Sequence, residues 1–118
     1  MFEKLGLEKI QYDVPEFHLA FIHKSFDNKH NNERLEFLGD AILETVISEL
    51  LFKKFGDANE GLLTRMRSTL VSTENLNLIC REYELHKDLK MSKGTLTLPD
   101  THKDKIYAGL VEAVIGSV

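Results

Sequence analysis

The feature that most constrains how this chain folds is a set of acidic residues at helical spacing. Glu33, Glu36 and Asp40 fall at positions i, i+3 and i+7. On a helix that turns about 100° per residue they share a stripe roughly 60° wide. The opposite side of the same helix carries the apolar residues Leu35, Leu38, Ile42 and Val46. We therefore predict an amphipathic helix over residues 33–55 that buries its apolar side and turns its acids outward.

The acidic stripe has two interpretations. Carboxylates stacked one turn apart repel each other and destabilise a helix. A fold tolerates them when a cation or a shared proton lies between them, so a metal site is one interpretation. The alternative is an ordinary acidic face in contact with water.

Length and charge limit the class of protein. The 118 residues suggest a single domain over 1–118, and 42% hydrophobic residues are normal for a globular chain. The net charge is −4. This balance argues against a protein that binds nucleic acid by bulk attraction, and it fits a site where bound cations offset acidic side chains.

The single cysteine, Cys80, excludes an intramolecular disulfide. It lies in an apolar periodic stretch, so we expect a buried, inert thiol, with a nucleophilic role as the alternative. One thiol favours a reducing compartment, and we expect an intracellular protein, cytoplasmic or nuclear. No run of about 18 apolar residues is present, so we expect no membrane partner.

The pattern along the chain predicts an all-α fold. Helices are expected at residues 2–10, 16–26, 33–55, 60–70, 74–83 and 105–118, with loops at 27–32, 56–59 and 92–104. Asn31 or Asn32, and Ser72 or Thr73, are the predicted N-caps. Residues 46–55 are apolar on most sides, which predicts that this segment is the central buried helix.

The amino-acid sequence of the acidic helix is a more specific signal than the spacing of its three acidic residues. Asn-Glu-Arg-Leu-Glu-Phe-Leu-Gly-Asp at 32–40, followed by Ala-Ile-Leu, resembles the signature helix of the ribonuclease III family. Residues 23–25 (His-Lys-Ser), 60–72 and 105–116 resemble three further blocks of the family. The resemblance implies a helical, dimeric endonuclease domain like the catalytic domains of Dicer and Drosha.

The same resemblance implies a divalent-metal-dependent endoribonuclease. Such an enzyme cleaves double-stranded RNA to staggered ends with 5′-phosphates during RNA processing. The catalytic and metal-binding residues would be Glu36, Asp40 and Glu112, with Mg²⁺ or Mn²⁺ as cofactor and up to two ions per site in the presence of RNA. Hard oxygen ligands suit these ions, which lower the pKa of a bound water and offset charge on a phosphate.

One position departs from the family's pattern. The family's last motif places an Asp and a Glu three residues apart, and here Glu112 matches while Gly109 occupies the aspartate position. Asp104 is a poor replacement, because it lies about 140° around the helix from position 109. We expect reduced or abolished cleavage. The alternative is a degenerate module that serves as a dimerisation or RNA-binding scaffold.

The resemblance also implies residues that assist RNA binding, namely Glu33, Glu60, Arg65, Arg67 and Lys105. Glu33 has an alternative role as an acid at a helix N-terminus. Arg65 and Arg67 point about 200° apart on a helix and cannot both contact one row of phosphates. Both could be ordinary solvated arginines. We expect His23 to be a packed, hydrogen-bonded residue that takes no part in catalysis.

The expected partners are double-stranded RNA and a second domain of the same kind. The acidic helix carries more apolar surface than one side can bury (Phe37, Leu38, Leu43, Val46, Ile47 and Leu50). We expect a homodimer, or a heterodimer with another ribonuclease III-type domain, with burial inside the monomer as the alternative. The chain ends inside an apolar pattern at 115–118, so we expect a missing C-terminal segment. We expect no double-stranded-RNA-binding domain within these residues, and therefore weak RNA binding.

Overall fold

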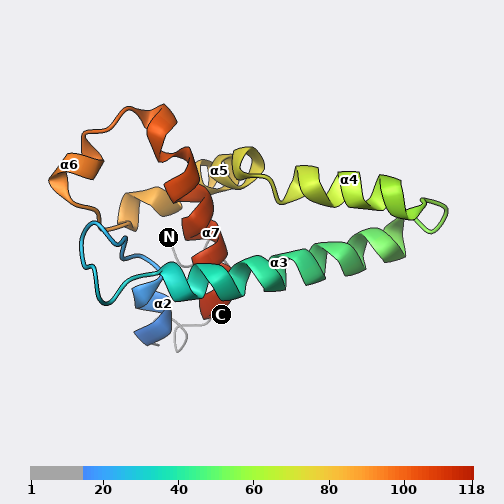
Figure 1. Ribbon diagram of the computed structural model, residues 1–118, viewed down its shortest axis with the longest axis horizontal. Coiled ribbons are helices and arrows are strands. Elements are labelled where there is room, and N and C mark those ends of the chain that lie inside the picture. The colour runs from blue at the N-terminus through green and yellow to red at the C-terminus, as the bar shows by residue number, and fades with distance from the viewer. Residues whose placement is uncertain (1–14) are drawn as a thin grey trace.

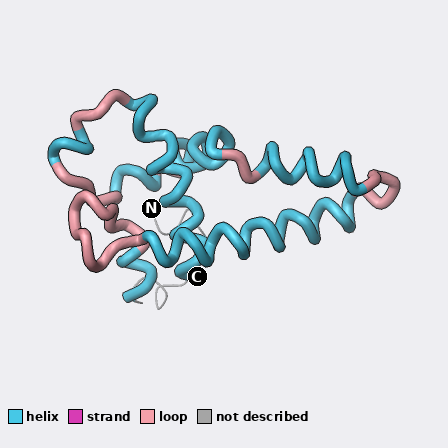
Figure 2. Tube along the Cα trace, in the orientation of Figure 1, coloured by secondary structure: helices cyan, strands magenta, loops and turns pink. Residues whose placement is uncertain are grey.

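The computed structural model describes residues 15–118, and within this range the chain is built from helices (Figures 1 and 2). Two single 3₁₀ turns accompany them, η2 (Leu85–Asp88) and η3 (Asp100–Lys103). The β structure among the described residues is one isolated parallel bridge between Ile22 and Lys90. The all-α prediction is confirmed. The α-helices are α2 (Pro15–Leu19), α3 (Glu33–Lys54), α4 (Glu60–Leu70), α5 (Thr73–Glu82), α6 (Lys93–Leu96) and α7 (Asp104–Ser117).

The central helix is α7, which crosses between α3 and α5 (Figure 1). Half of its residues are buried, and they pack with Phe17, Leu76 and Cys80 in the hydrophobic core. The prediction that residues 46–55 form the central buried helix is wrong. Among all residues of α3 only Gly39 and Leu51 are buried. Leu35 and Leu43 of α3 pack against the core as partly buried residues, whereas Leu38 and Val46 remain about half exposed.

The crossing of α3 and α7 is unusually close because glycines meet there. A Cβ atom added at Gly39 would overlap the backbone carbonyl of Glu112, and one added at Gly116 would overlap the carbonyl of Leu35. The two helices therefore touch backbone to backbone. This contact fixes how near the carboxylates of α3 come to Glu112.

The predicted helix over 16–26 is too long, since α2 ends at Leu19. The backbone beyond it pairs with distant segments. The N–H of Lys90 donates to the carbonyl of Phe21 at 2.8 Å, and the N–H of His23 donates to the carbonyl of Lys90 at 3.0 Å. These long-range bonds replace those that would have continued the helix. The helix predicted over 2–10 lies outside the described residues.

Most other helix boundaries agree with the sequence. Ser72 begins α5 and its hydroxyl accepts from the N–H of Asn75, as predicted. Asn32 begins α3, but its side chain donates to the carbonyl of Ala20, and the Asn31 side chain accepts from the N–H of Glu33 instead. The loop predicted over 92–104 contains α6 and η3. No described helix is both long enough and apolar enough to cross a membrane.

The second half of α3 and the whole of α4 form an arm that extends away from α7 (Figure 1). None of the residues of α4 is buried. One polar contact links the two helices, in which Arg67 Nη1 donates to Ser48 Oγ at 2.9 Å. Phe52 on α3 is 73% exposed. The arm therefore carries apolar side chains that the monomer leaves in water.

Candidate active site

A cavity of about 850 Å³ lies between α3, α7 and the loops that precede them. It gathers five of the predicted site residues: Glu33, Glu36, Asp40, Lys105 and Glu112. Its other lining residues are His23, Lys24, Asn32, Phe37, Thr95, Leu98, His102 and Ile106. The cavity thus combines four carboxylates with two lysines and two histidines.

Asp40 and Glu112 approach each other across the α3–α7 crossing, and a hydrogen bond between their side chains contributes to the raised pKa of Glu112. Burial raises the pKa of Glu112 to about 8, and the hydrogen bond and the negative charges of Asp40 and Glu36 act in the same direction. The raised pKa of Glu112 favours its protonated form relative to an ordinary glutamate. A proton held between two carboxylates marks a place where a cation would be favoured.

Glu36 lies against the bare backbone of Gly109. A Cβ atom added at Gly109 would come within 2.8 Å of Glu36 Oε2 and 3.0 Å of Glu36 Oε1. Burial is the main cause that raises the pKa of Glu36, and the negative charge of Glu33 adds to it. The positive charge of Lys105 opposes the shift. Because Gly109 has no side chain, the Glu36 carboxylate can lie directly against the backbone of α7.

The donor chemistry of the cavity suits a hard divalent cation, although the side chains do not already surround one. No group of three or more His, Cys, Asp or Glu side chains within residues 15–118 is arranged to hold a metal ion. Asp40 and Glu112 instead contact each other on facing helices. Carboxylate oxygens are the ligands that Mg²⁺ and Mn²⁺ prefer, so the donor types of Asp40 and Glu112 fit such an ion.

His23 is held by its neighbours, as predicted. Its Nδ1 accepts from the backbone N–H of Ser25 at 3.1 Å and lies 2.8 Å from Ser25 Oγ. The same hydroxyl oxygen accepts from the N–H of Ser92 at 3.0 Å. Burial, and secondarily the charge of Lys24, lowers the pKa of His23. A neutral ring that joins two loops has a structural role at the edge of the cavity.

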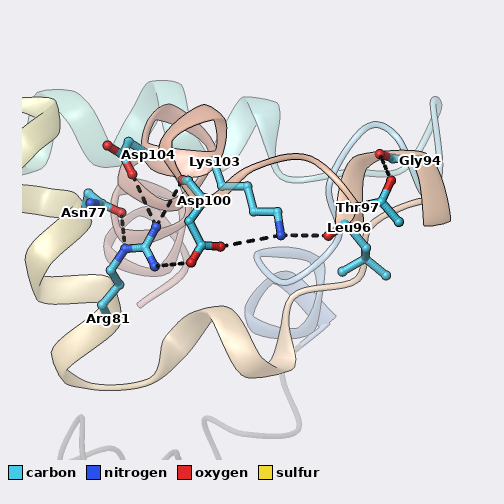
Figure 3. A network of polar contacts seen from close by, with 8 residues as sticks. All are labelled: Asn77, Arg81, Gly94, Leu96, Thr97, Asp100, Lys103 and Asp104. Carbon is cyan, nitrogen blue, oxygen red and sulfur yellow. Dashed lines mark hydrogen bonds and ion pairs between the residues drawn. The ribbon is translucent and has the colours of Figure 1, made fainter.

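A polar network around Arg81 anchors the beginning of α7 (Figure 3). The Arg81 guanidinium donates to Asn77 Oδ1 at 3.0 Å and to Asp104 Oδ1 at 3.3 Å. Lys103 Nζ donates to the carbonyl of Leu96 at 2.7 Å and so ties α6 to the same region. Because Asp104 pairs with Arg81, its carboxylate is engaged away from Gly109. The network holds the first turn of α7, which carries Lys105, in a fixed place.

The other predicted RNA-contacting residues lie outside the cavity. Glu60, Arg65 and Arg67 belong to α4, and Arg67 is engaged by Ser48 within the arm. Sequence reasoning missed Lys24, Thr95 and His102 as lining residues. Lys24 sits in the His-Lys-Ser block and could have been found there. Thr95 and His102 belong to a segment that comes near α3 only in the folded protein. No local sequence pattern predicts that they line the cavity.

Cys80 is fully buried, and burial raises the pKa of its thiol to about 11. Reactive cysteines have lowered pKa values and some exposure to solvent. The prediction of an inert structural thiol is therefore confirmed. The acidic cavity remains the candidate site of chemistry.

Comparison with known proteins decides the family. Residues 16–118 match the sequence model described as Ribonuclease-III-like. The chain belongs to the ribonuclease-III-like family. Ribonuclease 3 of Vibrio atlanticus is 47% identical over 115 residues, which cover 98% of this chain and 50% of that protein. Ribonuclease 3 of Acinetobacter baylyi is 41% identical over 115 residues, covering 98% of this chain and 49% of that protein. The chain thus spans about half the length of these curated relatives.

Solved structures agree with this family assignment. The nuclease domain of ribonuclease III from Campylobacter jejuni, described with structural flexibility in its region involved in dimer formation, superposes with a TM-score of 0.85. It is 35% identical, and the match covers 98% of this chain and 79% of that one. Dicer from Pichia stipitis gives a TM-score of 0.70 at 38% identity, covering 89% of this chain and 44% of that one. The predicted family and helical nuclease fold are confirmed.

Proposed function

We propose that this chain is a divalent-metal-dependent endoribonuclease domain that cleaves double-stranded RNA to staggered ends with 5′-phosphates. The observation that carries the proposal is the Asp40–Glu112 pair, in which an exposed carboxyl on α3 and a half-buried carboxyl on α7 meet inside a large cavity. Membership of the ribonuclease-III-like family supports the nuclease chemistry. The chain spans about half the length of the ribonuclease 3 proteins that it matches, so its substrate and its partners are also proposals.

Each side chain of the cavity has a task in this proposal. Asp40 and Glu112 would hold Mg²⁺ or Mn²⁺, and Glu36 would join them by rotating away from Gly109. When bound, such an ion lowers the pKa of a water molecule and offsets negative charge on a phosphate. Lys24 and Lys105 face the same cavity and attract the RNA backbone toward it. A-form RNA would be recognised by its shape and its 2′-hydroxyls.

The arm supports a second part of the proposal, that two copies of the chain associate. Phe52 is 73% exposed on α3, and an apolar groove of about 780 Å³ runs between α3 and α4. Leu50, Leu51, Met66 and Leu70 help to line this groove. A second copy would cover both features through a self-complementary contact, which is how two-fold dimers are built. The Campylobacter jejuni relative has a dimer-forming region, which agrees with this choice of partner.

Gly109 supports a competing function, a catalytically degenerate scaffold. By resemblance, the family's aspartate stands at this position, and its loss removes one carboxylate from the site. Losing even a group that only supports a ligand typically costs about 10–100-fold in metal affinity or activity. A scaffold would retain the fold, the arm and the contact with RNA while losing cleavage.

The test is cleavage of a long RNA duplex over a titration of Mg²⁺ and Mn²⁺. We expect slow cleavage in millimolar Mg²⁺ and faster cleavage in Mn²⁺. The variant Gly109→Asp should cleave at least about 10-fold faster, since a regained ligand reverses part of such a loss. The carboxylate of Glu36 is the far end of a flexible side chain and can move aside. Gly56→Asp, at a position with open space around it, is the matched control.

Absence of cleavage under every metal condition, in both the native chain and Gly109→Asp, would overturn the nuclease proposal. If those inert proteins still self-associate and bind RNA, the scaffold function replaces it. Native mass spectrometry and RNA gel-shift measurements supply these two readouts.

A further inference from the structure

We propose that His23 binds the RNA backbone by donating a hydrogen bond from its Nε2–H to a backbone oxygen, and that Ser25 is the positioning residue that holds the ring for this contact. The inference rests on the proposed function, since it needs duplex RNA in the cavity. It adds an uncharged binding residue to the site. Because the contact serves binding, it agrees with the expectation that His23 takes no part in catalysis.

The first support is the state of the His23 ring. The backbone N–H of Ser25 donates to Nδ1 of the ring at 3.1 Å. Because a backbone N–H can only donate, Nδ1 is the acceptor, and the neutral ring carries its hydrogen on Nε2. The Ser25 hydroxyl accepts from the N–H of Ser92 at 3.0 Å, which leaves its own hydrogen to donate to Nδ1 at 2.8 Å. Ser25 therefore sets both the tautomer and the orientation of the ring.

The second support is that Nε2 of His23 is open to solvent. Within residues 15–118 both hydrogen bonds of the ring end at Nδ1, and no group accepts from Nε2. Among the same residues, the only buried side-chain nitrogen or oxygen without a partner is His86 Nδ1. Nε2 of His23 is therefore reached by water. Because the ring lines the acidic cavity, its free donor is available to a molecule bound there.

The third support is that distant segments hold the ring in place before any ligand arrives. The backbone N–H of His23 donates to the carbonyl of Lys90 at 3.0 Å. Ser92, which bonds to Ser25, is also the N-cap of α6, and its hydroxyl accepts from the N–H of Thr95 at 3.2 Å. Thr95 lines the same cavity as the ring. A donor that is already fixed loses little conformational freedom on binding.

The fourth support is the chemistry of the acceptor. Lys24 and Lys105 line the cavity with His23 and attract an anionic backbone. Burial lowers the pKa of His23, which favours the neutral ring, so the Nε2–H adds a directed hydrogen bond without adding charge. An RNA backbone offers this donor phosphate oxygens and 2′-hydroxyl oxygens. Neither acceptor depends on the base, so the contact suits recognition of A-form RNA by shape.

The first test needs no RNA. Long-range ¹H–¹⁵N correlation NMR of the histidine rings, recorded at neutral pH, reports which ring nitrogen carries the hydrogen. The signals of His23 are assigned by their absence from the variant His23→Asn. We expect the native ring to be neutral with its hydrogen on Nε2, and any other dominant state would overturn the inference. This measurement on the native chain stands whether or not a variant folds.

The second test measures the affinity for a short RNA duplex without divalent ions, so that no strand is cut. His23→Asn keeps an oxygen where Nδ1 accepts from Ser25 and removes the Nε2–H, whereas His23→Gln places an amide N–H near the position of Nε2. The affinity of His23→Asn should fall about 3–10-fold, as expected for one hydrogen bond, and His23→Gln should recover part of it. His30→Asn, in an exposed loop outside the cavity, should bind as the native chain does.

The positioning role of Ser25 has a matched control in Ser72. The Ser72 hydroxyl also joins two backbone groups, since it donates to the carbonyl of Thr69 and accepts from the N–H of Asn75, but it does not line the cavity. Ser25→Ala and Ser72→Ala should both lower the melting temperature. Only Ser25→Ala should also weaken RNA binding, and Ser25→Thr, which keeps a hydroxyl, should restore part of that binding. Equal RNA affinity of the two alanine variants would overturn the role of Ser25.

Duplexes with 2′-fluoro groups distinguish the two acceptors. If a 2′-hydroxyl accepts the hydrogen bond, His23→Asn should cost no further affinity on the fluorinated duplex. If a phosphate oxygen accepts it, His23→Asn should cost the same on both duplexes.

The outcomes separate this inference from the proposed function. An RNA affinity of His23→Asn equal to that of His30→Asn would overturn the role of His23 and leave the nuclease standing. A native chain that binds the duplex but never cleaves it would remove the nuclease and leave the His23 contact in place. A native chain that binds no duplex RNA would remove both.

Discussion

The two halves of α3 have opposite surroundings. The first half, residues 33–43, crosses α7 and approaches so closely at Gly39 that no side chain fits between the two backbones. The second half, residues 44–54, packs with α4 and buries Leu51 alone. Leu50 and Phe52 in this half are more than half exposed.

This contrast separates two tasks within one continuous helix. The first half shapes the acidic cavity through packing inside the monomer, so changes there should affect folding and catalysis. The second half contributes little to the core and displays apolar side chains, so changes there should affect association with a second copy. Four predictions test this division, beginning with the largest expected effect.

Gly39→Ala should produce the largest loss. Its methyl group would overlap the backbone carbonyl of Glu112, which cannot rotate away as a side chain can. Overpacking of this kind costs up to about 3 kcal/mol or more in free energy of unfolding. Urea denaturation measures the change. Gly56→Ala, in open space at the end of the arm, should stay within about 0.5 kcal/mol of the native chain. Equal effects of the two substitutions would contradict the close crossing.

Glu112→Gln should reduce cleavage by at least about 100-fold, or about 2.7 kcal/mol in activation free energy, because a metal ligand is lost. The protein should still fold, since the amide keeps the shape of the side chain and buries no charge. Initial rates in Mg²⁺ measure the effect. Glu82→Gln at the exposed end of α5 is the control, and a similar rate for both variants would exclude Glu112 from the site.

Leu50→Glu tests the arm and should weaken self-association at least about 10-fold, because a charge would be buried in the proposed contact. Leu78 on α5 gives a matched control, since both leucines are 57% exposed in the monomer. Sedimentation equilibrium of Leu50→Glu and Leu78→Glu makes the comparison. If both variants associate as the native chain does, the arm is not the contact surface.

The smallest expected effect is a pH dependence of stability. The pKa of Glu112 rises from 4.5 to about 8 on folding, so the folded protein keeps a proton that the unfolded chain releases. This stabilisation is present below about pH 4.5 and is lost as the pH rises through about 8. Without divalent ions, the melting temperature should fall across this window, and because solvent screens the half-buried carboxyl we expect a fall on the order of a few degrees.

Millimolar Mn²⁺ should reduce that fall, because the cation replaces the shared proton between Asp40 and Glu112. Calorimetry at several pH values, with and without Mn²⁺, measures both effects. Glu112→Gln should lose most of the pH dependence. A melting temperature that rises steadily between pH 5 and 8 without metal would contradict the sign of the Glu112 shift.

The sequence predicts the parts of this fold that depend on local signals. The bounds of α4 and the N-cap at Ser72 follow from capping residues and helical periodicity, and both are correct. The end of α2 was missed because the backbone beyond Leu19 pairs with Lys90, and that pairing exists only after the chain has folded. The sequence also overestimated the burial of residues 46–55, because apolar composition does not distinguish an internal core from an intermolecular surface.

The sequence predicts which residues gather in the candidate site, but it does not predict their geometry. The spacing of Glu36 and Asp40 and the resemblance at Glu112 identified the carboxylates. The way Glu36 rests on Gly109 depends on the absence of a side chain on the facing helix. No periodicity within either segment encodes that contact. Lys105 and Glu36 likewise line one cavity only because α3 and α7 cross there.

The glycine crossing also limits how the cavity can adapt to different cations. With Gly39 and Gly116 in direct contact with the opposite backbone, the two helices can neither approach further nor be wedged apart without losing their packing. The carboxyl groups must then accommodate an ion by torsion about their own bonds. Ca²⁺, with its longer oxygen distances and higher coordination number, would find too few oxygens within reach, whereas the smaller Mg²⁺ completes its octahedron with water. Discrimination by ionic radius would thus originate in two residues that have no side chain.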